Sequence, residues 1–318
     1  MNIPYNLTSR EQEQDNIQIE FFVTLSLEKN SSLVKVDIEV ENKAIEHRVR
    51  VLFRTGIESV ESIADQQFGT IRRPVYLSEV ENWRENGWNE KPRTIEPMQS
   101  FVSLANDHEN VSIITDCVRE YQITGEKFDT IALTLFRSTP EMGKAELKDR
   151  PGRASGMANW ETPDANLLKN LKFNFAISIG KNEYSISKIS NISKEYLTPF
   201  YYYQAAEFKN VDIFFLMNKP EIQDVPFDYS IFSSENRNCI LSTVKKAEKE
   251  NALIIRVYNP DDKKSTDFDI IYHDDIKNTS LVKFDEETVM DNVEFSFDGN
   301  KINISEVKTC QALSIKVK

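Results

Sequence analysis

Histidine is the residue type that would most directly reveal metal or triad chemistry, and this chain has only three. His47, His108 and His273 lack a second His, Cys or carboxylate at the helical or hairpin spacing typical of a zinc site. The closest approach, His273-Asp274-Asp275, reads as a solvated turn. The sequence therefore gives poor support to Ser–His–Asp catalysis or metal-assisted hydrolysis within the chain.

Glycine and cysteine narrow the chemistry further. The nine glycines form no G-x-G pair and no P-loop, so neither a dinucleotide nor a nucleotide-phosphate site is predicted. In Gly152-Arg-Ala-Ser-Gly156 the serine stands one place too late for a nucleophile elbow. The three cysteines, Cys117, Cys239 and Cys310, are odd in number and have apolar neighbours, which predicts buried thiols and no disulfide framework.

Two long irregular segments, Thr55–Pro97 and Ser138–Asp164, are the candidate functional loops. They combine Arg with Trp, and this pair can bind sugars because aromatic faces pack on C–H surfaces while guanidinium groups donate to hydroxyls. The alternative is that the tryptophans plug the edges of a sandwich and the arginines pair with carboxylates, which composition alone favours. The candidate substrate-rim residues are Arg72, Arg73, Arg150, Arg153, Asn159 and Trp160.

The elements that must position these loops are β-strands. Alternating apolar and polar residues predict three successive antiparallel strands at Ile17–Leu27, Val34–Val40 and His47–Phe53. Helical periodicity is weak, and its best candidate is Ser193–Phe208 with Ser193 as N-cap. Further strands are predicted at Val111–Ile114, Thr130–Phe136, Leu171–Ile179, Val211–Leu216, Cys239–Val244, Leu253–Tyr258, Asp267–Tyr272, Val293–Phe297, Lys301–Ile304 and Leu313–Val317.

Length and charge set the broad class. A chain of 318 residues fits two β-domains, which we place at 1–245 and 246–318 because the polar stretch Lys245–Asn251 precedes a fresh series of strands. Its net charge of −12 disfavours nucleic acid, which needs clustered Lys and Arg. The apolar runs are too short to span a membrane, and the N-terminus has no basic and apolar signal, so a cytoplasmic protein is expected.

Nearly the whole chain, in order, carries a family resemblance, in the stretches Arg48–Val75, Arg119–Ile123, Thr130–Ser138, Arg150–Leu168, Lys172–Ile177, Thr243–Pro260 and Ile304–Val317. These stretches resemble the C-terminal β-rich region of glycoside hydrolase family 38, the α-mannosidases, and look closest to bacterial members. The resemblance implies a large antiparallel β-sandwich of the supersandwich, galactose-mutarotase-like kind, followed by a small C-terminal β-sandwich.

The resemblance also implies where the chemistry lies. Family members retain anomeric configuration through an Asp nucleophile and an acid/base carboxylate, with a zinc ion held by His and Asp. Those residues belong to an upstream α/β domain and a helical bundle, and this chain matches neither. We therefore assign it no catalytic residue, metal ligand or cofactor, expect the zinc in the missing catalytic domain, and expect the chain alone to be inactive.

Three hypotheses follow for the function. In the first, the chain is the C-terminal region of an α-mannosidase, packs against the upstream catalytic domain and completes the rim of a site for a mannose-containing saccharide. In the second, it is a stand-alone carbohydrate-binding module. In the third, it is a structural or oligomerisation scaffold, for which the absent upstream domain or a second copy of the chain is the candidate partner.

Overall fold

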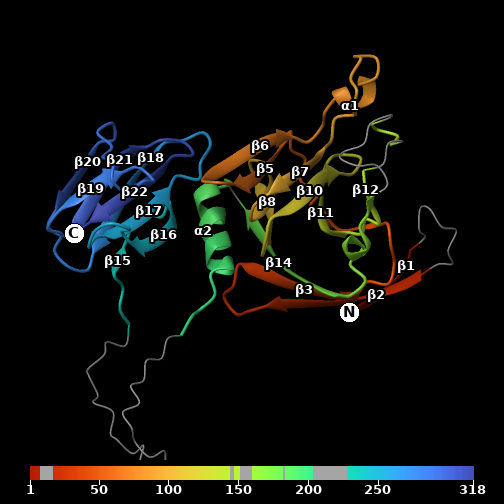
Figure 1. The fold of residues 1–318 in the computed structure, drawn as a ribbon, viewed down its shortest axis with the longest axis horizontal. Coiled ribbons are helices and arrows are strands. Elements are labelled where there is room, and N and C mark those ends of the chain that lie inside the picture. The colour runs from red at the N-terminus through yellow and green to blue at the C-terminus, as the bar shows by residue number, and fades with distance from the viewer. Residues whose placement is uncertain (8–16, 144–146, 151–159, 182, 203–227) are drawn as a thin grey trace, which may run out of the picture. The chain divides into compact units, whose positions relative to one another are not determined.

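The computed structural model describes residues 1–7, 17–143, 147–150, 160–181, 183–202 and 228–318. The chain divides into two compact units, Met1–Ile189 and Ser190–Lys318 (Figure 1). Both are built from antiparallel strands, which confirms the all-β prediction. In the described residues no helix is long and apolar enough to cross a membrane.

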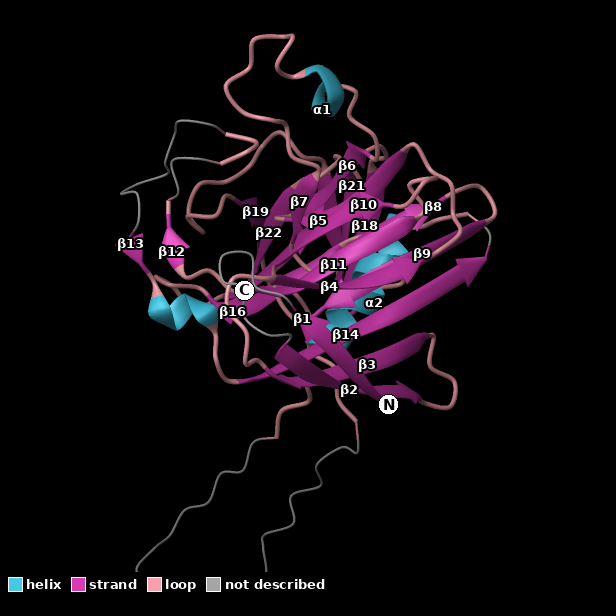
Figure 2. Cartoon of the chain, turned by 90° about the vertical axis from the view of Figure 1, so that its right-hand side faces the viewer, coloured by secondary structure: helices cyan, strands magenta, loops and turns pink. Residues whose placement is uncertain are grey.

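Two antiparallel sheets of unequal size form the first unit. In Figure 2 the strands of the larger sheet run side by side from β3 and β14 to β9 and β8. In spatial order, the larger sheet contains β1 (Asn2–Leu7), β2 (Ile17–Leu27), β3 (Leu33–Glu41), β14 (Asn170–Lys181), β9 (Glu109–Thr115), β8 (Phe101–Ala105), β5 (Glu61–Gln66) and β6 (Gly69–Pro74). The smaller contains β4 (Arg48–Arg54), β11 (Thr130–Arg137), β10 (Arg119–Thr124) and β7 (Ile95–Met98).

The inner faces of the two sheets share one hydrophobic core. Phe53 of β4 packs edge-to-face on Phe175 of β14, with ring centroids 5.6 Å apart. Phe136 of β11 stacks on Phe173 of β14 at 5.9 Å. Because every second residue of a strand faces the same way, the strands of the smaller sheet that fill this core must send their alternate residues to its outer face.

The three strands predicted in succession are present as β2, β3 and β4, but only the first two are neighbours in one sheet. β2 pairs with β3 as expected, but β4 pairs with β11 in the other sheet. The chain changes sheet after β3, where the buried Asn42 amide donates to the backbone oxygens of Asn166 (2.9 Å) and Leu167 (3.1 Å). That anchor depends on a segment more than 120 residues away, which local periodicity does not reveal.

The segment Thr55–Pro97, expected to be irregular, contains β5 and β6. β5 is buried on both faces, so it lacks the alternation by which strands are recognised. The predicted helix at Ser193–Phe208 is wrong at both ends. Helix α2 (Ile186–Leu197) begins earlier, where the Ser185 hydroxyl accepts the N–H of Lys188 at 3.3 Å, and it ends at Leu197, so Ser193 lies inside the helix and is not its N-cap. The short elements are α1 (Glu79–Asn82), β12 (Glu141–Met142), β13 (Trp160–Glu161) and a 3₁₀ turn at Pro163–Asn166.

The second unit is a smaller sandwich of two four-stranded sheets around its own core. The boundary expected after Lys245 falls inside β16, which pairs with β17 across it. The strand expected at Val211–Leu216 lies outside the described residues. In spatial order the sheets are β15 (Phe232–Ser233), β18 (Thr266–Tyr272), β21 (Lys301–Val307) and β20 (Phe295–Asp298), then β16 (Ile240–Lys246), β17 (Leu253–Tyr258), β22 (Ala312–Val317) and β19 (Thr279–Val282).

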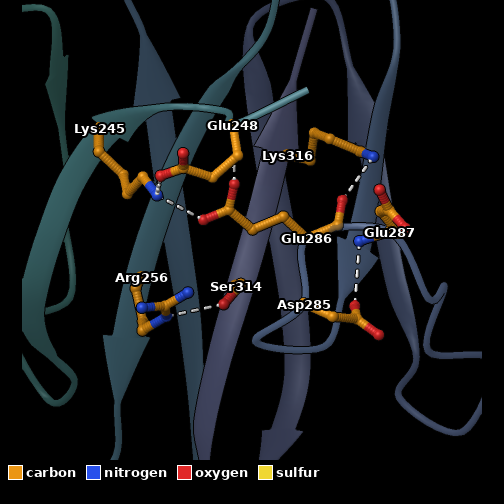
Figure 3. Close-up of polar contacts among 8 residues, drawn as sticks. All are labelled: Lys245, Glu248, Arg256, Asp285, Glu286, Glu287, Ser314 and Lys316. Atoms are coloured by element: carbon orange, nitrogen blue, oxygen red, sulfur yellow. Dashed lines mark hydrogen bonds and ion pairs between the residues drawn. The ribbon is translucent and has the colours of Figure 1, made fainter. Parts of the chain in front are cut away.

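A polar cluster ties the loop after β19 to the neighbouring strands of this sandwich (Figure 3). The Glu286 carboxylate accepts the Lys245 ammonium at 2.8 Å and the backbone N–H of Glu248 at 3.0 Å. Its backbone oxygen accepts the Lys316 ammonium at 2.8 Å. These charge-assisted bonds hold the loop against β16 and β22, and they lower the pKa of Glu286, first through Lys245.

Asp285 gives the same loop an acid-dependent contribution to stability. Its carboxylate accepts the Thr288 hydroxyl at 2.5 Å and the backbone N–H groups of Thr288 and Glu287 at 2.9 and 3.0 Å. These bonds lower the pKa of Asp285 to about 2. In the unfolded chain an aspartate has a pKa of about 3.9. The contribution of Asp285 to the free energy of unfolding is therefore complete above about pH 4 and is lost as the pH falls towards 2.

We therefore expect Asp285→Asn to lower the melting temperature at pH 6 and to flatten its decline between about pH 4 and pH 2. Thermal unfolding followed by circular dichroism across this range measures both effects. Asp298→Asn, at an exposed aspartate on β20, is the matched control and should keep the wild-type profile. An Asp285→Asn curve that runs parallel to wild type through the acid range would contradict the assignment.

Candidate functional site

The outer face of the smaller sheet carries an unusual density of arginine. Val49, Val51 and Phe53 of β4 pack on the core, so Arg48 and Arg50 project to the opposite face. In the strand register Arg137 of β11 lies opposite Arg48. Like charges placed opposite one another destabilise a sheet unless an anion lies between them.

A cavity of about 930 Å³ lies over this face. Its residues come from the strands of the smaller sheet, from the segments just before β4 and β7, and from the described part of the segment between β11 and Arg150. We call it the arginine cavity, after five of the side chains that line it: Arg48, Arg50, Arg93, Arg137 and Arg150. Three carboxylates, Glu46, Glu120 and Glu141, line it as well, so the lining carries more positive than negative charge in a chain whose net charge is −12.

Glu120 is the carboxylate around which the sheet arginines gather. Its Oε1 atom accepts Nε of Arg137 at 2.8 Å and lies 3.8 Å from Nη1 of Arg48. Arg50 instead donates to the neutral amide oxygen of Gln122 at 2.8 Å, and within the described residues it forms no ion pair. Arg93 pairs with Asp149 at 2.8 Å. The arginines are thus held in place chiefly by polar partners at the cavity wall.

His47 borders the same cavity as a neutral side chain. Its ring packs edge-to-face on Phe136 at 5.3 Å, and burial lowers its pKa. Both ring nitrogens are shielded from solvent, and a backbone contact with Ile45 opposes part of the downward shift of the pKa. The imidazole therefore adds no positive charge at neutral pH but keeps one N–H donor at the cavity.

The first pair of expected rim residues, Arg72 and Arg73, lies on β6 and does not line the arginine cavity. Arg72 pairs with Glu61 on the adjacent strand at 2.6 Å. Arg73 pairs with Glu96 at 3.1 Å and donates to the Tyr121 hydroxyl at 3.3 Å. It borders a separate cavity of about 190 Å³. Both arginines thus have carboxylate partners within the sandwich.

The second group of expected rim residues lies closer to the arginine cavity. Arg150 lines it directly. Trp160 is 55% exposed on β13, opposite Met142, which also lines the cavity. Arg153 and Asn159 lie outside the described residues. Sequence reasoning missed Arg48, Arg50, Arg93 and Arg137, although the alternating Arg-Val-Arg of the predicted third strand already placed two arginines on one face.

The described residues give little support to metal or thiol chemistry. In the described ranges no three His, Cys, Asp or Glu side chains are grouped to hold a metal ion, so these residues do not fit the zinc that the family resemblance implies. Cys239 is buried, which raises its pKa to about 12 and leaves the thiol unreactive. The expectation that all three cysteines are buried is wrong for Cys117 and Cys310, which are exposed.

Two family models match the chain, one in each unit. Residues 9–141 match "Glycosyl hydrolases family 38 C-terminal domain", and residues 238–316 match "Glycosyl hydrolases family 38 C-terminal beta sandwich domain". Together the two ranges cover more than half of the chain, in the order that the descriptions imply. The chain is therefore of the class that combines two different C-terminal β-domains of a glycosyl hydrolase family.

Individual relatives agree with this class. A protein of Halalkalibacterium halodurans described as "Putative mannosylglycerate hydrolase" is 24% identical over 292 residues, which are 90% of this chain and 28% of that protein. The crystal structure of an alpha-mannosidase from Enterococcus faecalis V583 superposes with a TM-score of 0.73 at 17% identity. A second Enterococcus faecalis structure, of a protein in glycosyl hydrolase family 38, gives 0.71 at 16% identity.

These comparisons show the family of the chain and how much of its relatives' length the chain covers. The two structures cover 97% of this chain, which covers 30% and 31% of theirs. The chain thus spans less than a third of the length of the relatives it matches. It belongs to glycoside hydrolase family 38, as part of the C-terminal region of that family.

Proposed function

We propose that the chain is the non-catalytic C-terminal region of a retaining α-mannosidase. In this proposal an upstream, zinc-dependent catalytic domain cleaves the glycosidic bond, and the present chain packs against that domain. Its loops, with Arg150 and Trp160 as the described candidates, complete the rim of the active site. The observation that carries the proposal is the match of both units to C-terminal domains of one glycosidase family.

The chemistry of retention supports this division of labour. A retaining glycosidase needs two carboxyl groups about 5–5.5 Å apart, one as nucleophile and one as acid/base. In the arginine cavity, Glu120 is instead paired with Arg137. We accordingly give this chain the tasks of binding and positioning.

The names of the relatives suggest the substrate class. Two descriptions name mannosides or mannosidase activity. We propose an α-mannoside as substrate of the whole enzyme, and mannosylglycerate, a mannoside that carries a carboxylate, as the first candidate to assay.

We expect the purified chain to hydrolyse neither an aryl α-mannoside nor mannosylglycerate, with or without added zinc, because the groups that break the bond lie in the proposed upstream domain. A chromogenic assay measures the first substrate, and mannose release measures the second. A family 38 α-mannosidase assayed in parallel shows that the conditions support turnover. Hydrolysis by this chain, lost on addition of a chelator, would contradict the proposal.

A further inference from the structure

We propose that the arginine cavity binds the anionic group, a carboxylate or a phosphate, of a sugar derivative. The sugar part rests on the proposed function, whereas the anion is argued from the cavity alone. The observation that carries it is the convergence of Arg48, Arg50 and Arg137 on one face of the smaller sheet, at a cavity large enough for a ligand.

The positive charge of the cavity wall favours an anion. Glu120 is the carboxylate that both Arg137 and Arg48 approach, at 2.8 and 3.8 Å. Arg50 beside them donates to the neutral Gln122 amide. Each guanidinium carries five N–H donors in a planar fork that matches carboxylate and phosphate oxygens. A bound anion would relieve the mutual repulsion of these cations in a partly desolvated site, where charge interactions are stronger than in water.

The size and mixed polarity of the cavity favour a small molecule. Its volume of about 930 Å³ lies at the upper end of the range of about 300–1,000 Å³ typical of ligand sites. Beside the arginines, the lining includes the apolar side chains of Ile95, Pro140, Met142 and Leu147. Apolar surface can pack on the C–H face of a sugar ring while the guanidinium groups bind its charged substituent. A single acidic side chain from another protein would leave most of this volume empty.

The direct test is calorimetric titration of the full chain at low salt with inorganic phosphate, glycerate, mannose 6-phosphate and neutral mannose. We expect an anion to bind with one-to-one stoichiometry and with an affinity that falls as salt is added. Phosphate and glycerate compared separately show which anion is preferred. Tighter binding of mannose 6-phosphate than of phosphate would show that the cavity also contacts the sugar.

Two substitutions that each remove one positive charge, one inside the cavity and one outside it, make the test specific. Arg50→Gln should weaken anion binding by about tenfold or more, because a charge-assisted bond is lost. Arg54→Gln removes the same charge from an exposed arginine on the same face of β4, outside the cavity lining, and should leave the affinity within about twofold. Arg137→Gln is the second cavity variant, in case Arg50→Gln does not fold as judged by circular dichroism.

Either of two results would overturn the proposal. The first is that none of the three anions binds, which would leave an acidic protein surface as the cavity's occupant. The second is that Arg54→Gln and the cavity variants weaken binding equally, which would mean general attraction to surface charge. Both results concern binding alone, so they are independent of whether the mannosidase assignment stands.

Discussion

Replacing Phe175 by alanine is expected to destabilise the first sandwich by about 3–5 kcal/mol. Phe175 is 1% exposed on β14, the strand between β3 and β9 in the larger sheet, and its ring meets Phe53 of the facing sheet edge-to-face. Truncation removes this pair and leaves a cavity that strands held on both sides cannot collapse to fill. Urea unfolding of the variant and of wild type measures the difference.

The matched control is Ile179→Ala, four residues further along the same face of the same strand. Ile179 is 68% exposed, so its truncation should cost less than about 0.5 kcal/mol. Because the chain has two compact units, the unfolding curve should show the loss in the first unit, with the transition of the second unchanged. Equal effects of Phe175→Ala and Ile179→Ala would contradict a core that lies between the two sheets.

Replacing Asn259 by aspartate is expected to destabilise the second sandwich by about 3 kcal/mol or more. Asn259 is 1% exposed just after β17. Its amide nitrogen lies 2.8, 3.1 and 3.2 Å from the backbone oxygens of Lys264, Val307 and Lys308, and its side-chain oxygen accepts the N–H of Asp261. Aspartate would turn these donations into repulsion between oxygens in a buried site.

Thermal unfolding of Asn259→Asp and Asn259→Ala compares repulsion with simple loss of the bonds. The aspartate variant should be the less stable of the two at neutral pH and should recover part of the difference on acidification, as its carboxyl is protonated. Asn251→Asp, at an exposed position between β16 and β17, adds the same charge without a buried partner. Equal stability of the aspartate and alanine variants would contradict the assigned hydrogen bonds.

Alternation of apolar and polar residues predicted much of this architecture. β2 and β3 were expected from Ile17–Leu27 and Val34–Val40, and the strand pattern after residue 250 anticipated β17, β18, β21 and β22. Alternation is clearest in β3 and β21, where one face of the strand is buried and the other is exposed. Alternation fails to predict β5, because both faces of that strand are buried. It also fails to predict the change of sheet after β3, because that change depends on the hydrogen bond from Asn42 to the backbone of Asn166.

The arginine cavity could be predicted only in part. The Arg-Val-Arg pattern of β4 places Arg48 and Arg50 on one face, but the position of that face depends on pairing with β11, whose residues lie 76 to 89 positions later in the chain than their partners. Arg93 and Arg150 reach the cavity from segments without regular alternation. The periodicity of a sequence does not predict where such segments cross a sheet. The expected rim residues therefore include Arg150 and omit the other arginines of the cavity.

The measurement that tests the central claim most directly is the zinc content of the purified chain, determined by mass spectrometry after dialysis against zinc, on the same preparation used for the mannoside assay. Our account assigns both the metal and the bond-breaking carboxylates to an upstream domain, and predicts far less than one zinc per chain and no turnover. One tightly held zinc per chain, together with hydrolysis of an α-mannoside, would show that this region contains a complete active site and would contradict the account.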